Sequence, residues 1–288
     1  MPIAIPEKLA AACRNDRQRA EWLRRLPDVL AGLERQWSLK VGTPFDGPDV
    51  SCAWVARVTC KGGIPAVLKL GMPHFEGEHE IDGLRFWDGD PTVRLLQADD
   101  ESGAMLLESS EPGTSLRELA ETAQDEVIAG LLRRLWRAPS GLHSFRPLAA
   151  MAEFWGREVE EHAPSWRDAG LVSEGLWLFR HLPETAAAAV LLATDLHAGN
   201  VLRARREPWL VIDPKPFVGD PAYDATQHLL NCYDRLRSDP DGVIRRVADL
   251  SGLDHQRVRL WIFARAAVQS GASPHNERSL ELARAIKI

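Results

Sequence analysis

The pattern of hydrophobic and polar positions predicts helices at the start of the chain, then a small sheet, then mostly helices. Apolar residues at helical spacing predict a helix over about 6–37, which the glycines of the segment from Gly42 to Gly47 interrupt. Runs rich in β-branched and apolar residues predict strands over 52–58, 65–70, 93–96 and 104–108. The first two runs flank Lys61-Gly62-Gly63, which predicts a hairpin turn, and a helix is expected over about 76–87.

The pattern changes after residue 108. Ser115 and Glu118 have the spacing of a capping box, at the start of a helix expected to reach about Trp136. The rest of the chain is mostly helical. The sequence therefore predicts an α+β fold with two lobes. Residues 1–108 would form the first, with an N-terminal helix, an antiparallel sheet and one embedded helix, and residues 109–288 would form a helical second lobe.

Two short apolar runs interrupt the helical part, and polar residues follow both. The run 186–193 precedes Asp195, His197 and Asn200, and the run from Trp209 to Ile212 precedes Asp213. Asn200 and Asp213 offer oxygen ligands of the kind that suits Mg²⁺. A carboxylate such as Asp195, beside a metal–phosphate site, can orient a hydroxyl group and accept its proton.

A candidate lysine for binding phosphate lies in the predicted sheet. Lys69 falls in the strand over 65–70, and the helix expected next carries Glu76, Glu78 and Glu80. A buried lysine on a strand needs a charge partner, and a glutamate of that helix could supply it. A strand lysine, a helix glutamate, a loop Asp with Asn and an Asp at a strand end are the parts that kinases use for phosphoryl transfer.

Longer motifs join these residues into a family pattern. The strongest is D-L-H-A-G-N-V-L…E-P-W-L-V-I-D-P-K-P-F-V-G-D-P-A-Y-D, over 195–224, supported by A-V-L-K-L-G, L-R-F-W-D-G-D-P-T-V-R-L-L and M-L-L-E-S-S-E-P-G-T-S-L. With these motifs the chain resembles the aminoglycoside phosphotransferases, and within them the streptomycin 6-kinase and hydroxyurea kinase branch. The resemblance covers nearly the whole chain and implies a bilobal protein-kinase-like fold with ATP and Mg²⁺ as cofactors.

The resemblance also implies a role for each matching residue. Asp195 would be the catalytic aspartate, and Asn200 and Asp213 would hold Mg²⁺. Lys69 would contact the α- and β-phosphates, and Glu80 would pair with Lys69. The backbone of Leu107, Glu108 and Ser109 would be the hinge that reads adenine, which would bind between the lobes. His197 would have a structural role in the catalytic loop.

The chain departs from the family pattern in three places. Ala193-Thr194 stands before the catalytic aspartate, where the family usually has His-Gly or His-Trp. The segment D-G-P-D-V-S-C-A-W lies where a phosphate-covering loop is expected but lacks G-x-G-x-x-G. Trp136 stands where related sequences often carry His.

The implied reaction is ATP-dependent transfer of a phosphoryl group to a hydroxyl group of a small molecule. The first candidate acceptor is an aminoglycoside such as streptomycin, at its 6-hydroxyl, which would confer antibiotic resistance. One alternative is a kinase of the same fold for another hydroxylated metabolite or amino sugar. The other is a catalytically silent nucleotide-binding module.

Composition and charge limit the classes of binding partner that we expect. The net charge of −6 argues against nucleic-acid and anionic membrane surfaces and suits a cationic acceptor. The segment 247–262 has the look of a DNA-binding helix-turn-helix, but in an acidic chain we expect it to pack within the second lobe. The acidic residues Glu158, Glu160 and Glu161 could bind a cationic sugar, although solvated helix charges are the simpler interpretation.

Other features point to the cytoplasm. The longest apolar run, 186–193, is too short to span a bilayer, and the first residues do not have the pattern of a signal peptide. The four cysteines include no C-x-x-C pair, so the sequence suggests neither a zinc site nor a redox motif. We expect a cytoplasmic enzyme that is a monomer or a weak dimer.

Overall fold

The computed structural model describes residues 3–47, 52–273 and 275–286, and it divides into two compact units. Unit 1 runs to Thr114 and also takes in Leu202–Ile212, and unit 2 contains Ser115–Val201 and the chain from Asp213 onward. Unit 1 contains a five-stranded antiparallel sheet and unit 2 is mainly helical, which confirms the predicted α+β class. The proposed lobe boundary after residue 108 lies six residues before the end of the first segment of unit 1.

The sheet of unit 1 has the strand order β1-β2-β3-β5-β4. Its strands are β1 (Lys40–Pro44), β2 (Ala53–Cys60), β3 (Ile64–Gly71), β4 (Leu95–Asp99) and β5 (Ala104–Glu108). Gly62 and Gly63, in the turn between β2 and β3, both have positive φ, as a tight hairpin turn requires, so the predicted hairpin is confirmed. The short strand β1 was not predicted, because its sequence K-V-G-T-P has few strand-forming residues.

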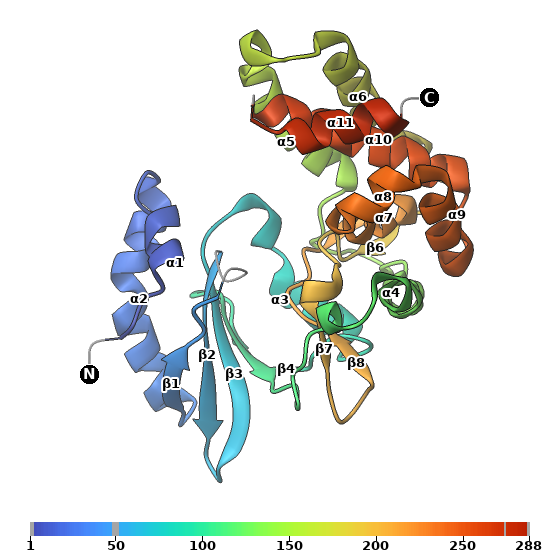
Figure 1. Ribbon diagram of the computed structural model, residues 1–288. Coiled ribbons are helices and arrows are strands. Elements are labelled where there is room, and N and C mark those ends of the chain that lie inside the picture. The colour runs from blue at the N-terminus through green and yellow to red at the C-terminus, as the bar shows by residue number, and fades with distance from the viewer. Residues whose placement is uncertain (1–2, 48–51, 274, 287–288) are drawn as a thin grey trace. The chain divides into compact units, whose positions relative to one another are not determined.

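Alternate residues of the strands face two different cores. Ala66, Leu68 and Leu70 of β3 pack on the side covered by α1 (Glu7–Ala12) and α2 (Arg17–Gln36) (Figure 1). The intervening residue Val67 packs on the other side, where the core includes Leu84 of α3 (Glu80–Trp87). Because side chains alternate along a strand, Lys69 shares this second side with Val67.

Three predicted helices differ from the observed ones. The single helix predicted over 6–37 is wrong, because the chain breaks between α1 and α2, where the Asp16 carboxylate caps α2 by accepting a hydrogen bond from the Arg19 amide. The helix predicted over 76–87 begins only at Glu80, after the 3₁₀ turn η1 (Phe75–Gly77). The helix predicted from Ser115 is a 3₁₀ turn, η2 (Leu116–Glu118), followed by α4 (Glu121–Leu135).

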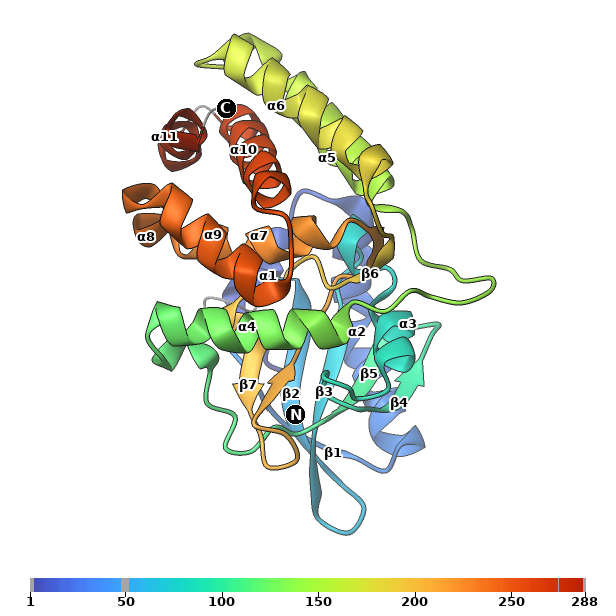
Figure 2. The ribbon, with the colours of Figure 1, turned by 90° about the vertical axis from the view of Figure 1, so that its right-hand side faces the viewer.

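Unit 2 is built around one buried helix. After α4, the helices of this unit are α5 (Leu148–Glu161), α6 (Ala169–His181), α7 (Pro221–Asn231), α8 (Tyr233–Ser238), α9 (Pro240–Ser251), α10 (His255–Ala272) and α11 (Glu277–Ile286), and α10 is the buried one. Helix α10 contacts five of these, α5, α6, α7, α9 and α11, and Figure 2 shows it among them. Val258, Trp261 and Ile262 of the suspected helix-turn-helix segment are fully buried, so this segment packs within unit 2 as expected.

Two short sheets carry the polar segments that follow the apolar runs. In unit 2, β6 (Val190–Leu192) pairs antiparallel with β9 (Phe217–Gly219). The strands β7 (Val201–Arg203) and β8 (Trp209–Val211) form the second pair. The first pair therefore brings residues just after 192 close to residues just before 217.

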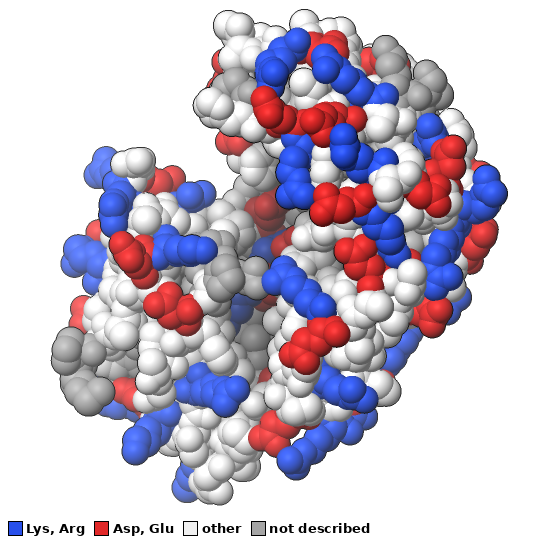
Figure 3. Space-filling view, viewed as in Figure 1, with Lys and Arg blue, Asp and Glu red and all other residues white. Residues whose placement is uncertain are grey.

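The surface of the helical unit carries charged side chains of both signs. On the face in Figure 3, Lys and Arg side chains are interspersed with Asp and Glu over the helical unit. Within the described ranges, no helix combines the length and the apolar character that a membrane crossing requires.

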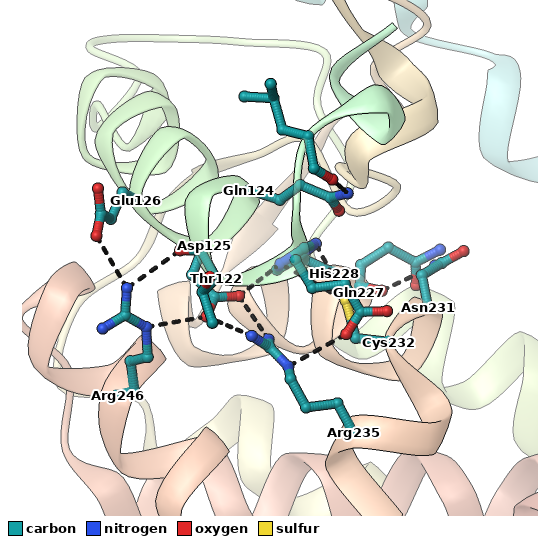
Figure 4. Close-up of polar contacts among 12 residues, drawn as sticks. Thr122, Gln124, Asp125, Glu126, Gln227, His228, Asn231, Cys232, Arg235 and Arg246 are labelled. Atoms are coloured by element: carbon teal, nitrogen blue, oxygen red, sulfur yellow. Dashed lines mark hydrogen bonds and ion pairs between the residues drawn. The ribbon is translucent and has the colours of Figure 1, made fainter.

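A buried ionic cluster joins α4 to α7, α8 and α9 (Figure 4). Asp125 of α4 is fully buried, and its carboxylate accepts two hydrogen bonds from Arg235, at 2.6 and 2.8 Å, and one from Arg246, at 3.1 Å. Its Oδ1 also lies 2.9 Å from Nε2 of the buried His228. Burial alone would raise the pKa of Asp125, but the hydrogen bonds from His228 and Arg235 outweigh it and lower the pKa.

The packing of α6 on α10 predicts the effect of one added methyl group. A Cβ atom at Gly175 would lie 2.3 Å from the Cβ of Ala267, and neither atom can rotate away, so the two helices must separate. We expect Gly175→Ala to lower the free energy of unfolding by about 1–3 kcal/mol, measured by urea unfolding. Gly170→Ala in the same helix is the control, because its nearest neighbour is Asp168 Oδ1 at 4.0 Å. Equal destabilisation of both variants would contradict the close approach.

The Asp125 cluster predicts a larger loss. Asp125→Asn would leave the mostly buried Arg235 and the partly exposed Arg246 facing a neutral amide, so we expect the free energy of unfolding at pH 7 to fall by about 3–5 kcal/mol. Because the pKa of Asp125 is lowered, its contribution is present above the ordinary value of 3.8 and is lost as the pH falls below it. The difference between wild type and variant should therefore shrink in acid. Asp234→Asn, an exposed carboxylate 3.4 Å from Arg278, is the control and should change little.

Candidate active site

In unit 1 the structure brings Lys69 and Glu80 together. Lys69 Nζ lies 2.5 Å from Glu80 Oε1, and both side chains are buried, with 8% and 4% exposed. Strand alternation turns Lys69 toward the α3 side of the sheet, and Glu80 stands in the first turn of α3. Glu76 and Glu78 lie before α3 begins, which is why Glu80 is the partner. A buried pair of this kind holds the ammonium group in one place.

The predicted hinge residues lie at the end of β5. Leu107 is buried in the core under α3, and the carboxylate of Glu108 accepts hydrogen bonds from Arg206, at 2.9–3.3 Å, and from the Arg94 amide, at 3.1 Å. Burial opposes ionisation of Glu108, but the Arg206 contact outweighs it and lowers its pKa. The Glu108 side chain is therefore held by partners within unit 1. One of them, Arg206, was missed by the sequence analysis.

Ser109 lines a pocket of unit 1 of about 790 Å³, together with Ser110 and residues of β1, β2 and β3. This volume lies within the range of small-molecule sites. The expected phosphate-covering loop runs through residues 48–51, which lie outside the described residues.

In unit 2, Asp195 and Asn200 share a short loop after β6. Asn200 Nδ2 donates a hydrogen bond to the Asp195 carbonyl oxygen at 3.0 Å and lies 3.5 Å from Asp195 Oδ2. His197 caps the 3₁₀ turn η5 (Ala198–Asn200), since its Nδ1 accepts a hydrogen bond from the Gly199 amide at 3.0 Å. This bond fits the structural role expected for His197.

Asp213 follows Ile212 with a positive φ of 53° and contacts a cation. Its Oδ1 accepts a hydrogen bond from Nζ of Lys215, whose side chain is buried. The sequence analysis missed Lys215, because a lysine two residues from an aspartate carries no signal that it will be buried.

The two segments meet at Ala193 and Thr194. The Ala193 carbonyl oxygen accepts hydrogen bonds from the amides of Asp195, at 2.7 Å, and Lys215, at 2.8 Å. Thr194 has a positive φ of 46°, and its hydroxyl group donates to the Lys215 carbonyl oxygen at 2.6 Å. The segments that carry Asp195 and Asp213 are thus joined by a backbone hydrogen bond and by a hydrogen bond from the Thr194 hydroxyl group.

Asp224, on α7, forms hydrogen bonds that hold this junction in place. Its Oδ2 accepts hydrogen bonds from the Ala193 amide at 3.0 Å and from Trp136 Nε1 at 3.1 Å. Trp136, which stands where related sequences often carry His, therefore supplies an N–H donor. Asp224 is fully buried, and burial raises its pKa to about 6 despite these two hydrogen bonds.

Burial and nearby charges act against each other at Asp195. Burial raises the pKa of its carboxyl group, and the neighbouring Asp213 carboxylate raises it further, while His197, Lys215 and Arg265 lower it. Burial wins, so the pKa of Asp195 lies above its ordinary value. A carboxylate with a raised pKa is a better proton acceptor than an ordinary surface aspartate.

Gln227 and Arg265 are two further contacts that sequence reasoning missed. Gln227 of α7 donates from Nε2 to Asp195 Oδ1 at 2.6 Å, and its Oε1 accepts a hydrogen bond from Arg265 of α10. No short motif marks either residue.

Asp220 and Glu160 have structural partners. Asp220 caps α7 by accepting a hydrogen bond from the Ala222 amide, and it also accepts hydrogen bonds from Trp261 and Arg257. Glu160 accepts two hydrogen bonds from Arg180, at 2.7 and 2.9 Å. This favours the interpretation of Glu160 as an ordinary helix charge.

The oxygen donors of unit 2 suit Mg²⁺ better than a metal with an all-protein cage. Asn200 uses its NH₂ group to donate to the Asp195 backbone, which leaves its carbonyl oxygen to act as a ligand. The described part of the chain has no group of three or more His, Cys, Asp or Glu that could enclose a metal. Mg²⁺ is commonly held by one or two protein oxygens together with phosphates and water.

Comparison with known proteins gives the same picture. A family model for aminoglycoside/hydroxyurea antibiotic resistance kinases matches residues 39–277. The chain is 34% identical to a streptomycin 6-kinase of Streptomyces glaucescens, over 99% of this chain and 97% of that protein. It is 36% identical to a hydroxyurea phosphotransferase of Kitasatospora aureofaciens, over 85% and 72% of the two chains.

Solved structures confirm the fold. The choline kinase LicA of Streptococcus pneumoniae aligns over 92% of this chain and 98% of its own, with a TM-score of 0.63 and 13% identity. A fructosamine-3-kinase homologue from Thermobifida fusca aligns over 90% and 98%, with a TM-score of 0.59 and 19% identity. The chain therefore has the protein-kinase-like fold that its motifs predicted.

The raised pKa of Asp224 predicts how stability changes with pH. Because its pKa rises from 3.8 to about 6 on folding, the folded state favours the protonated carboxyl, and stability is lost as the pH rises through this window. The free energy of unfolding of wild type, relative to Asp224→Asn, should fall by about 3 kcal/mol as the pH rises through this interval. Urea unfolding across this range measures the difference, and parallel pH profiles for the two proteins would contradict it.

Proposed function

The chain belongs to the aminoglycoside/hydroxyurea antibiotic resistance kinase family, and from this we propose that it transfers the γ-phosphoryl group of ATP to a hydroxyl group of streptomycin. As a member of this family it is an ATP-dependent phosphotransferase that acts on a small hydroxylated molecule. The observation that carries the substrate is its identity of 34% with a streptomycin 6-kinase over nearly the full length of both chains. The 6-hydroxyl is therefore the proposed position of transfer.

The proposed roles follow from the contacts within each unit. Asp195 would accept the proton of the acceptor hydroxyl as its oxygen bonds to the γ-phosphorus and ADP leaves. The raised pKa of Asp195 supports this role. In unit 1, Lys69 would bind the α- and β-phosphates, because Glu80 holds its ammonium group in place. The backbone from Leu107 to Ser109 would read adenine.

We propose that Asn200 and Asp213 hold Mg²⁺. The amide oxygen of Asn200 and the carboxylate oxygens of Asp213 are the kind of donor that Mg²⁺ prefers. When bound, the ion would neutralise negative charge on the ATP phosphates.

Hydroxyurea is the competing acceptor, because one relative of similar identity is a hydroxyurea phosphotransferase. The net charge of −6 favours a cationic acceptor over a neutral one through long-range attraction. The cytoplasmic location and a monomeric or weakly dimeric state stay predictions.

An ATP-consumption assay with Mg²⁺ tests the acceptor. We expect turnover with streptomycin and little with hydroxyurea, other aminoglycosides or amino sugars, and we expect mass spectrometry to find one added phosphate. Turnover with another acceptor alone would keep the kinase and replace the substrate. Mg·ATP binding without turnover on any acceptor would point to the silent module.

Substitutions in the same assay test the roles of two aspartates. Asp195→Ala should lower kcat by about 1,000-fold, since it removes the proton acceptor, while the Kd for Mg·ATP stays within about threefold. Asp213→Ala should lose both turnover and Mg·ATP affinity. Asp234→Ala, an exposed aspartate of α8, is the control for loss of one negative charge. Wild-type turnover by Asp195→Ala would overturn the mechanism.

A further inference from the structure

A chain of polar contacts leads from the interior of α10 to the Asp195 carboxylate. Arg265 of α10 is only 8% exposed, and its guanidinium group lies over the Tyr223 ring, 4.5 Å from the centroid. It donates to Thr226 Oγ1 at 2.7 Å and to Gln227 Oε1. Gln227 Nε2 in turn donates to Asp195 Oδ1 at 2.6 Å.

Arg265 fixes the direction of these bonds. A guanidinium group only donates hydrogen bonds, so the atom of Gln227 that faces it must be the amide oxygen. The NH₂ group of Gln227 must then face Asp195, where it donates to the carboxylate. Thr226 completes the arrangement, since its hydroxyl accepts from Arg265 and donates to the Tyr223 carbonyl oxygen at 2.6 Å.

The bond from Gln227 is much shorter than the other side-chain contacts of Asp195. Asn200 Nδ2 lies 3.5 Å from Oδ2, and His197 Nε2 lies 3.9 Å from Oδ1. Rotation of the Asp195 carboxylate is therefore limited mainly by one donor, which engages Oδ1. This leaves Oδ2 as the oxygen that can meet a hydroxyl group.

We propose that Gln227, oriented by Arg265, is a positioning residue that aims the Asp195 carboxylate so that Oδ2 receives the proton of the acceptor hydroxyl. This inference rests on the proposed function of Asp195. Both residues would act through the Asp195 carboxylate rather than on the acceptor itself. Their contribution is geometric, because an error of about 1 Å in the place of a catalytic group can cost about 100-fold in rate.

The sharpest variant is Gln227→Glu. It has nearly the same shape and keeps an oxygen for Arg265, but it replaces the donor that faces Asp195 with a second acceptor. We expect kcat to fall by about 100-fold, while KM for ATP and for the acceptor changes by less than about threefold and Tm is retained. Asn231→Asp, at an exposed position one turn further along α7, makes the same amide-to-acid change and should keep wild-type kcat.

A double-mutant cycle tests whether Arg265 acts through Gln227. Arg265→Lys keeps the charge but loses the planar fork that orients the amide. It should lower kcat by about tenfold in the wild-type background and have almost no further effect in Gln227→Ala. Equal effects in both backgrounds would show that Arg265 does not act through Gln227, and would overturn that part of the proposal.

A spectroscopic readout separates this proposal from the proposed function. In protein with ¹³C-labelled aspartate, the Asp195 carboxyl signal is assigned by its loss in Asp195→Asn. It should move in Gln227→Glu and not in Asn231→Asp. If wild type turns over no acceptor but the signal moves, the proposed function fails and the contact stands. The positioning role would be overturned if the signal did not move or if kcat were unchanged in Gln227→Glu. It would also be overturned if kcat, KM and Tm all changed together in that variant.

Discussion

The backbone of Ala193 is the joint on which the polar site of unit 2 depends. Its carbonyl oxygen accepts the amides of Asp195 and Lys215, so one atom ties together the segments that follow β6 and precede β9. Its own amide donates to the buried carboxylate of Asp224. Only main-chain atoms of residue 193 make these bonds, which explains how alanine can stand where the family pattern has histidine. The same Oδ2 of Asp224 also accepts a hydrogen bond from Trp136 Nε1.

In each unit, the arrangements that depend on local geometry could be predicted from the sequence. Asp195 and Asn200 are close enough in sequence to share a loop, and strand alternation places Lys69 toward the helix that follows. The choice of Glu80 over its neighbours came from the family pattern, and the structure explains it by the residue at which α3 begins. The order of helices and strands was predictable for the same reason, although the break at Asp16 depends on a capping contact.

The contacts that depend on tertiary packing could not be predicted. Gln227 is an ordinary residue of an amphipathic helix, and its bond to Asp195 exists only because α7 packs beside the loop after β6. Arg265 would be expected on the surface, yet it is buried because Gln227, Thr226 and the Tyr223 ring provide partners for a guanidinium group. The burial of Lys215 depends in the same way on the aspartate beside it.

Helix α7 connects two buried carboxylates whose pKa values shift in opposite directions. His228 contacts Asp125 and the preceding residue, Gln227, contacts Asp195, so two neighbours about 100° apart on the helix face different sites. At Asp125, hydrogen bonds and cations outweigh burial and lower the pKa, and the carboxylate anchors the helix. At Asp195, burial outweighs the cations and raises the pKa, and the carboxylate is suited to accept a proton. Because a helix transmits position rigidly, the anchoring carboxylate also limits how far Gln227 can move relative to the carboxylate proposed to react.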